Sequence, residues 1–504
     1  MPENWSERVA DTEQLDKIDP WVWRVAIVVV LGSLMSILDT TIVNVALQTL
    51  HTELHSPLSD IQWVITGYLL ALAVVIPISG WASRRFGAKN IYLMSIVLFT
   101  AGSALCGLAT SADALIVFRV LQGVGGGMIM PVGQMILADA AGPKRMGRVL
   151  AVTGVPTLLG PILGPTIGGL LIDSASWRWI FYVNVPIGIV ATVLAVRMLP
   201  APNRDANVPR LDISGLLMLA VGLPALTYGL AEVGATGGFS SAKVIVSILA
   251  GVVLIAVFIW HALRVPAPLL DLRLFQRSTY ASAAAAMFFL GAALFGVMIL
   301  LPLYFQNVRG ESVLDTGLLL APQGIGMAIV MPIVGRMADR IGGGPLTIFG
   351  VIVASLAGIP FGLIGAHTSL VALGFEQAIR GVGIGFAFMP AFIAAFAALE
   401  RHELPDAAPQ LTVLMRVGGS IGTAVLAVVL QRTLASAHHP LTLAAAAGAY
   451  GTAFWWGVAI IVAAVVPCLI LLRAERKARG IARARADADR DSGSGPAALA
   501  EVAA

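Results

Sequence analysis

Charged side chains are scarce in this 504-residue sequence. Only 12% of the residues are Asp, Glu, Lys or Arg, while 58% are apolar and the mean hydropathy is +0.88. A soluble domain carries roughly 25% charged residues. So few charges cannot cover a water-soluble protein of this length, and we therefore expect a lipid bilayer to be part of its solvent. The net charge of +4 gives no indication of nucleic-acid binding.

Cysteine is almost absent, and so are the motifs of enzymes. Cys106 and Cys468 lie far apart in apolar runs, which argues against a disulfide framework. The sequence has no glycine-rich ATP loop followed by Lys and Ser or Thr. It has no His, Cys and Asp set with metal-ligand spacing either. We therefore expect no enzyme activity, no metal and no cofactor. Residues 1–20 lack an apolar core, so we expect no cleavable signal peptide.

Long apolar stretches, in contrast, are abundant. Each membrane crossing needs roughly 20 mainly apolar residues, and the breaks between such stretches carry Gly, Pro and charge. The sequence predicts fourteen spans, at 22–50, 58–80, 91–109, 112–137, 148–172, 178–199, 211–231, 241–263, 279–305, 313–335, 345–365, 369–396, 409–435 and 448–472.

Lys and Arg are distributed unevenly over the predicted loops. Cytoplasmic loops of membrane proteins hold an excess of both residues. With the N-terminus inside, the inner loops and the C-terminal tail hold most of them. The outer side then keeps only Arg178, Lys243, Arg309 and Arg432. This asymmetry predicts an even number of spans with both termini in the cytoplasm.

Two short motifs occur twice. Residues 80–87 follow the second span and resemble residues 335–342, which follow the tenth. Arg119 and the glycines after it in the fourth span match Arg380 and its glycines in the twelfth. In both pairs the second copy lies eight spans after the first. Two six-helix halves with two extra helices between them explain this spacing. Repeated halves with a site between them are a transporter architecture.

The predicted organisation has five parts. They are a cytoplasmic segment at 1–20, a six-helix bundle at 21–199, two extra helices with their linkers at 200–278, a second six-helix bundle at 279–472, and a basic, disordered cytoplasmic tail at 473–504.

Asp39 places a carboxyl group in the first apolar run. Ser36, Thr40, Asn44 and Gln48 recur every four residues beside it and form one polar stripe. A charged Asp at the bilayer centre costs on the order of 3 kcal/mol, so it should face the protein interior. There it either carries a proton or serves as a structural hydrogen-bonding group. Intramembrane acids are usually functional, which favours the first interpretation.

Arg119 is the matching cation in the fourth span. Its expected depth differs from that of Asp39 by about one helical turn, which allows an electrostatic pair. The alternative is that Arg119 binds backbone carbonyls and only ties helices together.

Glycine and proline are dense in the fifth span. Glycines every four residues make a groove that another helix can approach closely, and prolines supply kinks at fixed places. Generic packing explains these glycines but not prolines at this density. The pattern consists of Gly154, Pro156, Gly160, Pro161, Gly164, Pro165, Gly168 and Gly169.

Together these motifs resemble the major facilitator superfamily. The fifth span, Arg119 with Gln122 and Gly123, and the loop at 80–87 carry the resemblance. The runs at 38–47 and 177–186 look like the fourteen-helix drug:proton antiporters of that superfamily. The resemblance extends over residues 22–472. It implies an all-α major facilitator fold, with two six-helix bundles and two extra central helices, driven by the proton gradient.

The resemblance also implies roles for single residues. In that family the aspartate of the first helix is linked to proton coupling, the glycine–proline helix marks antiporters, and the inner loop gates alternating access. Arg84 stands where the first loop often has Asp, which puts its usual acid–base latch in doubt, while Asp339 keeps the acid in the second copy. The gating residues implied are Gly80, Arg84, Arg85, Gly87, Asp339, Arg340 and Gly342.

Glu376 and Arg380 lie four residues apart in the twelfth span. This spacing predicts an ion pair that neutralises itself. A second proton site or a contact to a cationic substrate is the alternative for Glu376. Adaptable, largely aromatic surfaces suit varied lipophilic ligands. Candidates to line a substrate cavity are Asn44, Gln122, Phe289, Gln323, Phe386, Phe388 and Trp455.

The sequence thus predicts a bacterial inner-membrane antiporter that exchanges inward protons for outward lipophilic, often cationic, drugs. Its partners would be these small molecules, protons and membrane lipids, and a periplasmic adaptor stays an open question. A dedicated exporter of an endogenous lipid or antibiotic-like metabolite would use the same proton motor. A receptor or scaffold with a transporter fold is disfavoured, because Asp39 and Arg119 would cost energy there without a return.

Overall fold

The computed structural model describes residues 19–142, 174–200, 208–236, 241–436 and 442–477, with residue 238 and isolated positions in 149–172. Every regular element among them is a helix, which confirms the predicted all-α fold class. Twelve of these helices are long and apolar enough to cross a membrane, and one bent pair makes a thirteenth. The predicted span at 148–172 lies mostly outside the described residues, so the count of fourteen stays a prediction.

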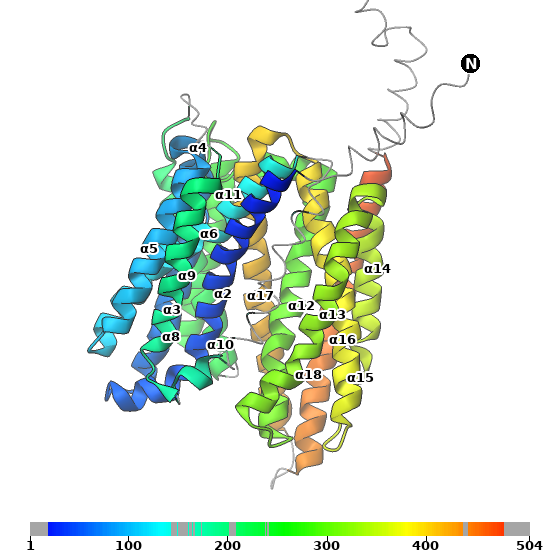
Figure 1. Ribbon diagram of the computed structural model, residues 1–504. Helices are drawn as coiled ribbons and strands as arrows, with labels where there is room; N and C mark the ends of the chain where they lie inside the picture. The colour runs from blue at the N-terminus through cyan, green and yellow to red at the C-terminus, as the bar shows by residue number, and fades with distance from the viewer. Residues whose placement is uncertain are drawn as a thin grey trace, which may run out of the picture.

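The first half of the chain forms one bundle, blue to teal in Figure 1. Its second span is broken, with a bend of 57° between its two helices. The break falls at Pro77, since a proline lacks the backbone N–H and disturbs the helix before it. The helices of this half are α2 (Pro20–Glu53), α3 (Leu58–Val75), α4 (Ile78–Phe86), α5 (Ala88–Leu108), α6 (Ala112–Ala141), α8 (Trp179–Tyr182) and α9 (Asn184–Met198).

The second half repeats this arrangement, green to orange in Figure 1. Its helices are α12 (Ser278–Asn307), α13 (Val313–Ile341), α14 (Gly343–Leu356), α15 (Ile359–Gly362), α16 (Leu370–Ala397), α17 (Leu404–Ala435) and α18 (Leu443–Ala463). The short 3-10 helices η1 (Leu272–Gln276) and η2 (Arg401–Glu403) precede α12 and α17. The five-part division predicted from the sequence stays a prediction at its boundaries.

Two helices connect the halves, α10 (Ile213–Thr236) and α11 (Ala242–Ala262). α10 packs against α3 of the first half and against α17 of the second, while α11 packs mainly on α10. Val246, Leu249 and Val253 of α11 are exposed. In a membrane protein, such an exposed apolar face lies against lipid tails. The connecting pair is therefore wedged against both bundles on one side and bordered by lipid on the other.

The two repeated motifs were predicted as loops, but both are helical up to their last glycine, since residues 80–86 lie in α4 and residues 335–341 in α13. Both motifs end in the same backbone geometry. Gly87 follows α4 with a φ of 86°, and Gly342 follows α13 with a φ of 88°. Residues other than glycine rarely adopt such angles. The last glycine of each repeat therefore ends one helix and lets the next start at once, which explains its place in the motif.

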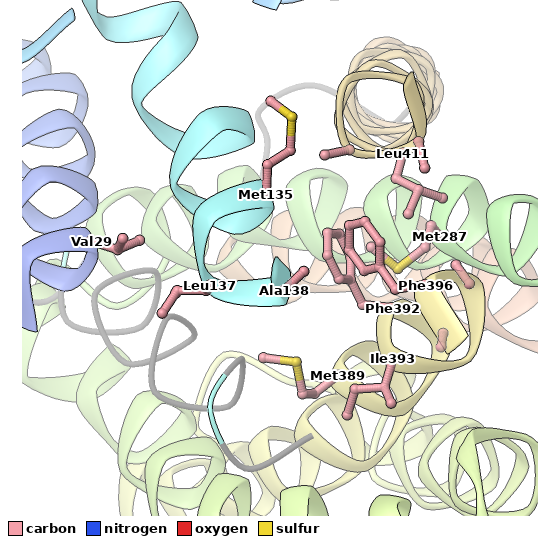
Figure 2. Packing of buried hydrophobic residues seen from close by; sticks show 14 of the residues in the cluster. Val29, Met135, Leu137, Ala138, Met287, Met389, Phe392, Ile393, Phe396 and Leu411 are labelled. Carbon is pink, nitrogen blue, oxygen red and sulfur yellow. The ribbon is translucent and has the colours of Figure 1, made fainter. Parts of the chain in front are cut away.

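The largest apolar cluster joins the two bundles. It contains Ala138 of α6 together with Met287 of α12 and Phe392 and Phe396 of α16, and Figure 2 shows them close together. Two of the remaining clusters behave differently, because one lies wholly in the second half and another wholly in the first. Among the described residues the halves thus share a core at one end, here called the Arg84 end, and have separate cores at the other, here called the Trp177 end.

Candidate functional site

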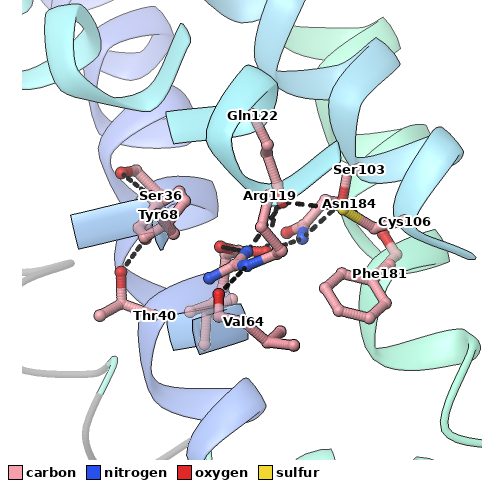
Figure 3. A network of polar contacts seen from close by, with 12 residues as sticks. Ser36, Thr40, Val64, Tyr68, Ser103, Cys106, Arg119, Gln122, Phe181 and Asn184 are labelled. Atoms are coloured by element: carbon pink, nitrogen blue, oxygen red, sulfur yellow. Dashed lines mark hydrogen bonds and ion pairs between the residues drawn. The ribbon is translucent and has the colours of Figure 1, made fainter. Parts of the chain in front are cut away.

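A buried polar network lies inside the first bundle, and Figure 3 shows Arg119, Gln122 and Asn184 of this network close together. These three side chains surround Asp39. Arg119 of α6 donates from Nη1 to one carboxylate oxygen at 2.6 Å. The other oxygen accepts from Gln122 Nε2 at 2.8 Å and from Asn184 Nδ2 at 3.2 Å. All four side chains are buried, with exposed fractions of 0 to 1%. The predicted pairing of Asp39 with Arg119 is therefore present as a direct ion pair, with two further donors.

Arg119 also makes contacts besides its ion pair with Asp39. Its Nε donates to the carbonyl oxygen of Val64 at 3.0 Å, and Nη1 donates to Gln122 Oε1 at 2.8 Å. The guanidinium carbon lies 4.0 Å from the centre of the Tyr68 ring. A guanidinium over an aromatic face is attracted by the ring quadrupole. Both interpretations of Arg119 made from the sequence are thus realised, since it pairs with an acid and also binds a backbone carbonyl of the neighbouring helix.

Asn184 and Ser103 belong to this network and were missed from the sequence. Asn184 Nδ2 donates to Ser103 Oγ at 3.2 Å, and that hydroxyl donates to the carbonyl oxygen of Phe181 at 2.9 Å. Asn184 Oδ1 is buried and has no hydrogen-bond partner among the described residues. An orphaned buried acceptor costs about 1–3 kcal/mol. The sequence signal that could have indicated Asn184 is the presence of an amide side chain near the start of the sixth apolar span.

The contacts of Asp39 make each member of the ion pair depend on the other. Arg119, Gln122 and Asn184 surround the buried carboxyl group with hydrogen-bond donors. A buried pair that loses one partner is destabilised by roughly 3–5 kcal/mol, because the other charge remains without compensation.

At the Arg84 end, ion pairs replace the acid that the first loop lacks. Arg84 of α4 donates from Nη1 to Asp406 of α17 at 2.5 Å, which connects the two halves. Arg277 binds both carboxylate oxygens of Glu403 at 2.8 Å. Arg84 of the first repeated motif is thus paired with an acid that the other half supplies, while a gating role for this pair stays a prediction.

The other residues predicted to gate transport lie on α4 and at the end of α13. A side-chain carbon built on Gly80 would overlap the carbonyl oxygen of Pro405, so a glycine is needed where α4 meets α17. Arg85 is exposed in the last turn of α4. Arg340 lies in the last turn of α13. The side chain of Asp339 lies outside the described residues.

The described glycines of the fifth span face α2. A side-chain carbon on Gly160 would overlap Ile37, one on Gly164 would overlap Thr41, and one on Gly168 would contact Ile42. Thr41 Oγ1 also donates to the Gly160 carbonyl at 3.0 Å. The described part of the groove thus receives the helix that carries Asp39. Gly169 has open space around it, whereas Gly154, Pro156, Pro161 and Pro165 lie outside the described residues.

Glu376 and Arg380 do not form the i,i+4 ion pair expected from their spacing. Arg380 is 5% exposed and donates from Nη1 to Gln323 Oε1 at 3.2 Å. Glu376 Oε2 is buried and has no hydrogen-bond partner among the described residues. The two side chains therefore turn to different surroundings, although one helical turn separates them.

The candidate cavity residues are scattered. Gln122 belongs to the Asp39 network, and Gln323 binds Arg380. Phe289 and Phe388 are half-buried beside the cluster shared by both halves. Phe386 packs edge-on against the exposed Phe349, and Trp455 is 43% exposed beside Gly362. The side chain of Asn44 lies outside the described residues.

Two bundles of membrane-spanning helices, with a buried acid–base centre in one of them, define a membrane transporter rather than an enzyme. The chain belongs to the Major Facilitator Superfamily, whose family model matches residues 29–427. As a multi-span member of this superfamily, it is a protein of the plasma membrane.

Relatives of known name agree with this membership. The chain is 42% identical to the Multidrug resistance protein B homolog of Mycobacterium tuberculosis, over 82% of this chain and 77% of that protein. It is 31% identical to the Multidrug export protein EmrB of Escherichia coli, over 78% of this chain and 77% of that protein. Similar solved structures include the human organic anion transporter MFSD10, at 16% identity and a TM-score of 0.60 over 90% of this chain and 100% of that chain. The proton:xylose symporter XylE matches at 14% identity and a TM-score of 0.60, over 89% of this chain and 95% of that chain.

Proposed function

We propose that this protein is a proton-coupled antiporter that exports lipophilic, often cationic, drugs by alternating access. The names of the similar multidrug proteins from M. tuberculosis and E. coli support drug export. The observation that carries the proposal is the fully buried Asp39, held by Arg119, Gln122 and Asn184 within the first bundle. Intramembrane acids that face the bundle interior are typical of proton relays.

The cycle follows from the two charge states of Asp39. In its ionised form the carboxylate binds Arg119 and the two amides. A proton that arrives from outside neutralises it, weakens the pair and leaves Arg119 with a free charge. Conversion to the inward-facing state then releases the proton to the cytoplasm. A cationic substrate competes with the proton for the same negative charge, which couples the two movements.

We place the Arg84 end in the cytoplasm, together with both termini. Positive charge concentrates in the loops predicted for that side, as expected for cytoplasmic loops. The halves share their core and the Arg84–Asp406 pair at this end and have separate cores at the Trp177 end. On this assignment the conformation is closed to the cytoplasm.

The proposal is tested in proteoliposomes with an imposed pH gradient. Asp39→Asn should abolish uphill efflux, because the amide mimics the protonated acid and releases no proton. Insertion should stay near normal, since a neutral amide costs less in the membrane than a charge. Asp113→Asn is the matched control, because Asp113 is an exposed acid at the start of α6. Uphill efflux and proton movement by the Asp39→Asn protein would place coupling elsewhere, with Glu376 as the next candidate.

The same assay separates drug export from dedicated export of an endogenous lipid or antibiotic-like metabolite. Both would require Asp39, so the readout is the substrate range. A multidrug exporter should move several unrelated lipophilic dyes, whereas a dedicated exporter should move none of them and accumulate one cellular compound in vesicles. Activity in proteoliposomes of the purified chain would also show that transport across this membrane needs no adaptor.

A further inference from the structure

The second bundle contains an arginine that matches Arg119 but lacks its acid. Arg380 of α16 occupies the repeat position of Arg119 of α6. Arg119 has an ion pair, two further hydrogen bonds and a stacked tyrosine ring. Arg380 is also almost fully buried, yet its one hydrogen bond goes to the neutral amide oxygen of Gln323. Within the described part of the chain no carboxylate neutralises it.

A pocket lies beside this arginine. Arg380 of α16 is its charged lining residue. The remaining lining is apolar or glycine, and it comes from α12, α14, α15 and α18 and from Gly358 just before α15. α12 is the repeat counterpart of α2, the helix that supplies Asp39. It presents Ala293 and Val297 to the pocket instead of an acid. The place where the first bundle has its carboxylate is thus apolar and partly empty in the second.

An unpaired guanidinium in such a place is costly. A buried charge is tolerated when a countercharge or several hydrogen bonds compensate it. Glu376, one turn away, forms no ion pair with Arg380, and a single bond to Gln323 satisfies one of the five N–H groups that a guanidinium carries. The surroundings therefore lack one negative charge.

We propose that the Arg380 pocket binds a monovalent anion, either a halide ion or the carboxylate group of a larger molecule. The guanidinium supplies charge and N–H donors. The apolar walls favour an anion that loses its water easily, so chloride and bromide fit better than phosphate. This site is separate from the Asp39 network and requires neither proton coupling nor drug transport.

The test is anion binding to the full-length protein in detergent, without substrate or gradient. Chloride is titrated against phosphate, the anion that fits the pocket poorly, at constant ionic strength, with radioactive chloride binding and thermal unfolding as readouts. At ten times the dissociation constant, a single site should favour the folded state by a factor of about eleven. Acetate replaces chloride in a second series, because a response to acetate but not chloride would identify a carboxylate as the ligand. No saturable response to either anion would overturn the proposal.

Three variants locate the site. Arg380→Gln should abolish the response, and Arg264→Gln, which removes an exposed arginine stacked on Trp260, should keep it. Val297→Asp should also abolish it, because the new carboxylate supplies the missing charge from α12 as Asp39 does from α2. An anion response that persists in Val297→Asp or in Arg380→Gln would overturn the proposal. If one of these two proteins does not fold, the other still provides the test. Failure here leaves the proton-coupling proposal unaffected, because no efflux is measured.

Discussion

Asp39 is held by donors from two further elements of the first bundle. Arg119 and Gln122 lie on α6, one turn apart, and Asn184 opens α9. Each donor is itself buried, so the carboxylate has no contact with water in this conformation. A proton can therefore reach Asp39 only if the bundle rearranges. In the proposed function, protonation and conformational change therefore depend on the same group of side chains.

Arg119→Gln tests this view at a single residue. The substitution removes the cation that pairs with Asp39 and leaves a buried acid without its countercharge. If Asp39 couples transport to protons, the pH profile of efflux in proteoliposomes should shift, and maximal efflux should fall. Arg178→Gln is the control, because Arg178 lies at the Trp177 end, donates to a backbone carbonyl and stacks on Trp177. An unchanged profile for Arg119→Gln would show that Arg119 does not influence the titrating group.

Sequence reasoning found the charged members of the network and missed the neutral ones. A charge in an apolar run has a large energetic cost, so Asp39 and Arg119 are conspicuous without any structure. An amide or a hydroxyl costs far less, and Asn184 resembles many polar residues at helix starts. Asp406 was missed because an acid in the first turn of a helix is a common stabilising feature. Its role depends on the packing of α17 on α4, which no local pattern reveals.

At the scale of elements, the glycines of the fifth span determine how closely it approaches α2. Their described members face Ile37, Thr41 and Ile42 of that helix. The spacing of these glycines predicted close packing, but it gave no indication of the partner. The partner matters, because α2 carries Asp39, so the groove holds the helix of the buried acid in place.

Gly164→Leu should abolish export while the protein still inserts. The leucine would overlap Thr41 and force the fifth span away from α2, since a small residue is needed for close helix approach. Gly169→Leu is the matched control from the same span, because Gly169 has open space where a side chain would begin. Efflux is measured at equal expression. Normal efflux by Gly164→Leu would show that the close approach is dispensable.

At the scale of the molecule, the two bundles are connected mainly at the Arg84 end. The shared apolar cluster and the Arg84–Asp406 pair form this connection. An alternating-access cycle must break these contacts and form new ones at the Trp177 end. The sequence predicted the two halves from their repeats, but it could not indicate which end is closed. That depends on the balance between contacts at the two ends.

Disruption of the Arg84–Asp406 pair should make the Arg84 end open more often. A partly exposed ion pair contributes about 1 kcal/mol or less, so Arg84→Ala should raise the rate of thiol labelling at a buried position of the shared cluster by about fivefold at most. The probe is Leu411→Cys in a protein whose Cys106 and Cys468 are replaced by serine. The exchanged pair, Arg84→Asp with Asp406→Arg, should restore slow labelling. Equal labelling rates in all of these proteins would exclude a latch at this position.

The orientation in the membrane is tested by cysteine labelling of intact cells. Ser436, just after α17, is exposed at the Trp177 end, and Arg210, before α10, is exposed at the Arg84 end. Ser436→Cys should react with a membrane-impermeant reagent, while Arg210→Cys should react only after the cells are opened. The reverse pattern would contradict the cytoplasmic assignment of the Arg84 end.

Asp39 is the one acidic side chain among the fully buried residues that the structure describes. If each cycle carries one proton on this group, the charge of the exported molecule decides the electrical balance of transport. Exchange of one proton for one monovalent cation moves no net charge, and the membrane voltage then neither assists nor opposes it. Exchange for a neutral molecule moves one charge inward, which adds about 2.3 kcal/mol of driving force per 100 mV. The voltage dependence of efflux would therefore differ between neutral and cationic substrates of the same protein.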